Sequence, residues 1–101
     1  MTKQDFVNKF YPAAKAAGAE FNINPVVVLA QAAIESGWGE SKLSSYNNFF
    51  GITAYGRINN YWHGGKIQLA DNGLTFRRYD TMENHFMDYF RSIPSSSPTT
   101  S

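Results

Sequence analysis

The residue with the clearest chemical potential is Glu35, which ends an almost wholly apolar run, PVVVLAQAAI. Gln31 lies four residues earlier and would share its face of a helix, where such positions are neighbours. Apolar surroundings and the negative end of a helix dipole both disfavour a charged carboxylate. An acid that keeps its proton in this way can donate it to a leaving oxygen. The alternative is a glutamate that reaches solvent at a helix end.

Several other kinds of chemistry are disfavoured by what the chain contains. It has no cysteine, which removes disulfides, thiol catalysis and the common zinc sites. His63 and His85 lie far apart, with no carboxylate pair at ligand spacing, so we expect no metal and no cofactor. A net charge of +1 without a basic cluster argues against nucleic-acid binding. No apolar run approaches the roughly 20 residues of a membrane helix.

The composition is that of one small folded domain. Hydrophobic residues make up 43% and charged residues 17% of the 101 positions. We expect the domain to occupy residues 1–93. The last residues, 94–101, read PSSSPTTS and are typical of a linker or disordered tail. The start, MTKQDFVNKF, lacks the basic and apolar regions of a signal peptide.

Helical periodicity predicts a first helix from Asp5 to Ala19, with a capping signal between Thr2 and Asp5. Pro12 suggests a kink or a late start, because proline removes a hydrogen bond inside a helix. Gly18 is the expected stop.

A second helix carries Glu35. Asn24 is its expected N-cap and Pro25 its first residue, and the helix should end at Gly37 and Gly39. Because residues 26–34 are nearly all apolar, we expect it to be buried on most sides. Residues 41–46 suggest a short third helix.

The second half of the chain predicts a hairpin and a final helix. Residues 66–69 and 74–79 read as strands joined at DNG, a strong hairpin signal. Arg77 and Arg78 should face opposite ways and lie at the surface. Thr81 is the expected N-cap of the last helix, whose apolar face comprises Met82, Phe86, Tyr89, Phe90 and Ile93. Helices, a small antiparallel sheet and a further helix define an α+β fold.

Three motifs identify a family. LAQAAIESGWGES, NNFFGI and FRRYDTMENHFMDYF occur in this order and closely resemble the peptidoglycan glucosaminidases of glycoside hydrolase family 73, over residues 6–93. The resemblance implies a lysozyme-like domain with a helical lobe, a β-lobe and a cleft between them. It also implies hydrolysis of the β-1,4 bond after N-acetylglucosamine in cell-wall glycan, with Glu35 as the general acid.

The second carboxylate of a glycosidase is harder to assign. Family members commonly carry a glutamate on the hairpin, where this chain reads GGKIQLADNG and has Leu69 at the matching position. Asp71 is the nearest replacement, unless it only helps the turn to bend. Asp88 matches a family aspartate proposed to assist, although a solvated aspartate on the last helix is the simpler interpretation.

The expected substrate contacts fall in four places. Gln31 lies beside the acid, and Asn47 and Asn48 can offer amide hydrogen bonds to sugars. Gly51 would let backbone approach the sugar. The remaining candidates are aromatic: Phe50 beside the cleft, Tyr61 and Trp62 as stacking platforms, and Tyr79, which by resemblance faces the acid.

Three other functions remain open. A lytic transglycosylase also uses one glutamate, but usually follows it with a GLMQ-type segment where this chain has NNFFGI. A glycan-binding module could keep the acid without a competent base. A structural domain of a phage tail or secretion machine is compatible with either. The expected partner is the glycan of peptidoglycan, which places the protein in the cell wall, the periplasm or outside the cell. A further domain beyond the tail is possible.

Overall fold

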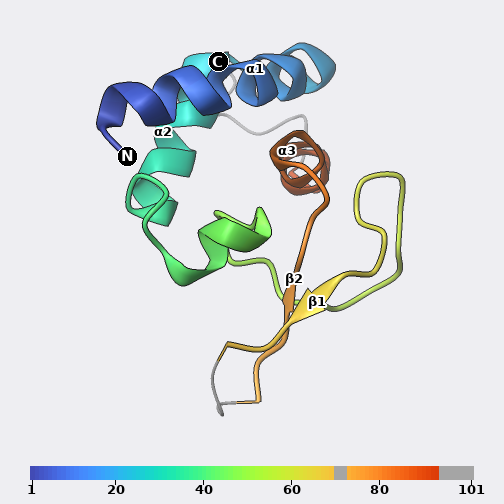
Figure 1. Ribbon diagram of the computed structural model, residues 1–101. Coiled ribbons are helices and arrows are strands. Elements are labelled where there is room, and N and C mark those ends of the chain that lie inside the picture. The colour runs from blue at the N-terminus through green and yellow to red at the C-terminus, as the bar shows by residue number, and fades with distance from the viewer. Residues whose placement is uncertain (70–72, 94–101) are drawn as a thin grey trace.

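The computed structural model describes residues 1–69 and 73–93, and it has the α+β organisation that the sequence predicts (Figure 1). The elements are α1 (Lys3–Phe21), α2 (Pro25–Ser36), the 3-10 helix η1 (Lys42–Tyr46), β1 (Lys66–Ile67), β2 (Phe76–Arg77) and α3 (Met82–Arg91). In Figure 1 the helices form the upper part of the molecule and the two-stranded sheet lies below them.

Helix α1 is longer than expected at both ends. Thr2 and Asp5 form the predicted capping box. The helix passes through Pro12, so a late start after this residue is wrong. Gly18 does not end it either; Asn22 does, in the left-handed conformation at φ 56°. The role of Gly18 is steric, since a Cβ there would lie 2.4 Å from the carbonyl oxygen of Ile23.

Helix α2 begins and ends as predicted, with Asn24 as N-cap, Pro25 in the first turn and Gly37 as C-cap. The expectation that it is buried on most sides is wrong. Val28, Leu29, Ala32 and Ala33 face the core. On the other side Val26 and Ile34 are 64% and 77% exposed, because α1 covers only one face of the helix.

The sheet is shorter than expected. β1 and β2 pair antiparallel over two residues each, with Lys66 opposite Arg77 and Ile67 opposite Phe76. Thr53 adds an isolated bridge to Phe76, so the chain leaving the helical region also joins the sheet. Asp71 and Asn72 of the predicted DNG turn lie outside the described residues, and so does the predicted tail at 94–101.

Helix α3 begins at the predicted N-cap, Thr81, and ends at Arg91, so Ile93 packs on the core from beyond its end. The core forms where α1 packs against both α2 and α3. Phe49 fills its centre, with its ring centroid 4.9 Å from that of Phe10 and 5.6 Å from that of Phe6. The loop that carries Phe49 is therefore attached to the helical core. Among the described residues, no helix is long and apolar enough to cross a membrane.

Candidate active site

Glu35 lies in the last turn of α2 and is exposed to solvent. The apolar burial expected around it is absent, because Ile34 and the outer face of α2 are also exposed. Its carboxylate forms no hydrogen bond or ion pair with the part of the chain that the structure describes. A free, accessible acid on a rigid helix can meet a large substrate from solvent.

The turn after Glu35 fixes the end of the helix. Gly37, Trp38 and Gly39 all have positive φ, at 57°, 58° and 82°. Ser36 holds this turn: its hydroxyl donates to the carbonyl of Ala32 at 2.6 Å and accepts from the amide of Gly39 at 2.9 Å. Trp38 packs edge-on against Phe6 in α1, with ring centroids 5.5 Å apart. The ESGWG motif therefore builds a rigid helix end that keeps Glu35 in place.

The NNFFGI motif forms a compact loop at residues 47–52. Asn47 adopts φ 56° and donates from its side chain to the carbonyl of Tyr79 at 3.0 Å. Asn48 is fully buried; its oxygen accepts from the amide of Ile52, and its nitrogen donates to the carbonyls of Ile52 and Arg77. The carboxamide of Asn48 therefore binds this loop and β2 and is not exposed to a sugar in this conformation.

The remaining candidates of this loop stay accessible. Gly51 has φ 67°, which favours glycine, and a Cβ there would meet no atom within 4 Å, so the space beside it is open. Phe50 is half-buried and stacks on Tyr89 with ring centroids 4.0 Å apart. Gln31 on α2 is exposed, and Tyr61 is half-buried.

Asp88 is not the solvated aspartate that the simpler interpretation expected. It is 3% exposed and accepts hydrogen bonds from four side chains, which we call the Asp88 cluster. The donors are the Arg77 guanidinium at 2.6 Å, Arg91 at 2.9 Å, Asn59 at 3.0 Å and the Tyr79 hydroxyl at 2.5 Å. Both carboxylate oxygens accept hydrogen bonds, so Asp88 links α3, β2 and the loop before β1.

The electrostatics of this cluster agree with an ionised carboxylate. Burial acts to raise the pKa of Asp88, but hydrogen bonds from Tyr79 and Arg91 and the charge of Arg77 outweigh it and hold the pKa below its usual range. Burial raises the pKa of Tyr79, and its hydrogen bond to Asp88 raises it further. Tyr79 therefore stays a neutral donor to a buried anion.

Three further expectations differ from the geometry found in and beside this cluster. Trp62 is 2% exposed, its indole N–H donates to the carbonyl of Gly65 at 2.8 Å, and the Arg77 guanidinium lies 4.1 Å from the centroid of its ring. It cannot stack on a sugar in this conformation. Arg77 is not a surface residue, and the hydroxyl of Tyr79 points to Asp88 rather than being free to meet Glu35. These side chains hold the β-lobe together.

Sequence reasoning also missed His85, which is fully buried. Its Nε2 accepts the backbone N–H of Phe49 at 2.9 Å and that of Phe50 at 3.3 Å. The available signal was its position on α3, four residues before Tyr89 and three before Asp88, which puts it at the edge of the apolar face.

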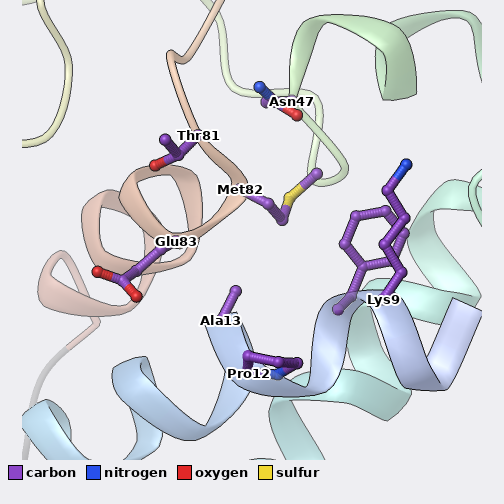
Figure 2. A pocket seen from close by; sticks show the side chains of 8 residues that line it. Lys9, Pro12, Ala13, Asn47, Thr81, Met82 and Glu83 are labelled. Atoms are coloured by element: carbon purple, nitrogen blue, oxygen red, sulfur yellow. The ribbon is translucent and has the colours of Figure 1, made fainter.

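A shallow groove lies between α1 and the start of α3, and Glu35 is not among its lining residues (Figure 2). Its lining residues are Lys9, Phe10, Pro12, Ala13, Asn47, Thr81, Met82 and Glu83. Asn47 is the one expected substrate contact among them. Within the described residues, no group of three or more histidine, aspartate or glutamate side chains is placed to hold a metal ion.

Comparison with known proteins agrees with this arrangement. The family model of glucosaminidases, described as mannosyl-glycoprotein endo-beta-N-acetylglucosaminidase, matches residues 11–99. The chain is 33% identical over 104 residues to a protein of Vibrio parahaemolyticus named peptidoglycan hydrolase FlgJ; the match covers 89% of this chain and 32% of that protein. The chain therefore spans about a third of the length of this relative.

Solved structures show the same lysozyme-like fold. The glycoside hydrolase domain of Salmonella typhimurium FlgJ superposes with a TM-score of 0.74 at 25% identity, covering 91% of this chain and 60% of that one. The catalytic domain of the autolysin Auto from Listeria monocytogenes gives a TM-score of 0.71 at 27% identity, covering 89% and 55%. The recognition made from the three sequence motifs is confirmed: the chain belongs to the glucosaminidase family of glycoside hydrolases.

Proposed function

We propose that this protein hydrolyses the glycan strands of peptidoglycan at the β-1,4 bond that follows N-acetylglucosamine. Membership of the glucosaminidase family and the names of its relatives, peptidoglycan hydrolases, support this substrate class. The cell wall is then the place of action, outside the cytoplasmic membrane.

Glu35 is the general acid in this proposal. The main observation in support is that the carboxylate of Glu35 is free at the end of α2. The turn from Ser36 to Gly39 fixes this helix end. Glu35 donates its proton to the glycosidic oxygen as the bond from that oxygen to the anomeric carbon breaks. The acid must be recharged with a proton from water after each cycle.

The other half of the reaction needs a nucleophile at the anomeric carbon. Asp88 is buried and accepts four hydrogen bonds, so we do not assign it this role, and Asp71 lies outside the described residues. We propose that no covalent glycosyl-enzyme forms. A water molecule aided by Asp71 would give an inverted product, whereas attack by the substrate's own acetamido group would give a retained one. The anomer released first, read by proton NMR, separates the two routes.

Wall clearing tests the role of Glu35. Purified cell walls should lose turbidity with the wild-type protein, and Glu35→Gln should slow clearing at least about 100-fold while its circular dichroism stays unchanged. Glu40→Gln is the matched control, since Glu40 is also exposed and close in sequence. A folded Glu35→Gln that clears walls normally contradicts the assignment. Wild-type protein that sediments with walls without clearing them would be a glycan-binding module.

A further inference from the structure

His85 makes an unusual pair of hydrogen bonds. One ring nitrogen, Nε2, lies 2.9 Å from the backbone nitrogen of Phe49 and 3.3 Å from that of Phe50. Both partners are donors, so Nε2 must be an acceptor and cannot carry a proton. The proton of the neutral ring is therefore on Nδ1.

The other ring nitrogen of His85, Nδ1, lies in an unfavourable environment. Nδ1 is buried and has no hydrogen-bond partner among the described residues. The rings of Tyr79 and Phe50 lie beside the imidazole, with centroids 4.8 and 5.3 Å away. A buried N–H without an acceptor is destabilising, and an aliphatic residue of similar size would avoid it. We therefore attribute the presence of a histidine here to Nε2, which accepts the hydrogen bonds from the loop.

The loop that His85 binds is the one from residue 47 to 52. Its own side chain Asn48 closes it from within, by hydrogen bonds to Ile52. His85 holds it from α3, and Phe50 stacks on Tyr89 of the same helix. Two residues that retain a proposed substrate contact, Asn47 and Gly51, flank the amides that His85 accepts. A fixed backbone at Phe49 and Phe50 therefore fixes the positions of both.

We propose that His85 is a positioning residue of the active site, a permanent hydrogen-bond acceptor that holds the 47–52 loop where the sugar binds. This inference rests on the proposed function for its link to activity, although its hydrogen-bond part does not. His85 does not touch the substrate. Burial lowers the pKa of His85 to about 3, against a smaller opposite effect of Asp88, so the ring stays neutral at the pH of most bacterial surroundings.

The tautomer gives a direct test on the unmodified protein. In ¹⁵N-labelled protein, Nε2 of His85 should resonate as an unprotonated nitrogen and Nδ1 as a protonated one, without change from pH 5 to 8. Amide exchange at Phe49 and Phe50 should be slow. An imidazole protonated on Nε2, or one that titrates near pH 6.5, overturns the proposal.

Variants test the consequence for activity. His85→Leu removes the acceptor, and we expect faster exchange at Phe49 and Phe50 and at least a 10-fold loss of kcat/KM. His85→Gln can place an oxygen near the same amides and should recover activity to within about 3-fold of wild type. Ala17→Gly is the control for stability alone, because it weakens α1 away from the loop and should keep kcat/KM.

The outcomes separate this proposal from the broader one. A folded His85→Leu with wild-type kcat/KM and slow exchange at both amides contradicts the positioning role. If the wild-type protein has no hydrolytic activity, the proposed function fails. The tautomer and the exchange rates then still decide whether His85 holds the loop.

Discussion

Lowering the pH from 7.5 to 5 should destabilise the folded chain through His85. The pKa of this residue is about 3 in the folded state against an ordinary 6.5. Between these two values the unfolded chain binds a proton at His85 and the folded chain does not. A histidine whose pKa is lowered in the folded state therefore reduces the free energy of unfolding of the protein as the pH falls below 6.5. The loss is about 1.4 kcal/mol per pH unit, or about 2 kcal/mol at pH 5. Any folded-state pKa below about 4 gives nearly this value.

Of the other groups with a shifted pKa, Asp88 acts outside this window and His63 opposes the effect. Asp88 has a lowered pKa, so its stabilisation is present above the ordinary value of 3.8 and is lost only at more acidic pH. His63 acts in the opposite direction. Its hydrogen bond to Asp80 raises its pKa, so its contribution is present below 6.5 and lost as the pH rises through the raised value. His63→Gln removes this opposing effect and provides the proper background.

Urea unfolding at the two pH values measures the effect. In the His63→Gln background, the free energy of unfolding should fall by about 2 kcal/mol at pH 5, which moves the midpoint by about 1 M. In His63→Gln/His85→Leu the fall should disappear, because no buried imidazole remains. Equal midpoints at both pH values, or a fall that survives in the double variant, would refute the assignment of His85 as a buried neutral acceptor.

The Asp88 cluster and the Trp62 ring beside it give two further predictions. Asp88→Asn should destabilise the fold by about 3–5 kcal/mol, because it leaves the Arg77 guanidinium buried without a counter-charge; a loss below 1 kcal/mol in urea unfolding would show that the cluster is not needed. Trp62→Ala should cost about 3–5 kcal/mol and lower the melting temperature in calorimetry, since its ring is core. A small thermal change with weakened glycan binding would instead restore Trp62 as a stacking residue.

The sequence predicted the features that depend on neighbouring residues. Helix ends at Thr2, Asn24, Gly37 and Thr81 are set by side chains and backbone angles within one turn, and all four are found. The fold class and the family were also predictable, because motifs such as ESGWG combine several such local requirements. Gly18 shows the limit, since its reason is the close passage of the Ile23 carbonyl.

Features that depend on packing between distant segments were not predictable. Val26 and Ile34 look like core residues in sequence, but whether they are covered depends on which segments reach that face of α2. Arg77 and Asp88 look like surface charges, and only the fold brings them together beneath Trp62. The location of Glu35 at a helix end was therefore predictable, because it follows from one helix, whereas side-chain surroundings were not predictable where several segments meet.

The central claim is tested most directly by the chemistry of the new chain ends in digested peptidoglycan. After digestion, borohydride reduction and mass spectrometry, the wild-type protein should produce muropeptides that end in reduced N-acetylglucosamine, and Glu35→Gln should produce almost none. Ends of reduced N-acetylmuramic acid, or 1,6-anhydro ends typical of a transglycosylase, would contradict a glucosaminidase. Equal release by the two proteins would contradict Glu35 as its acid.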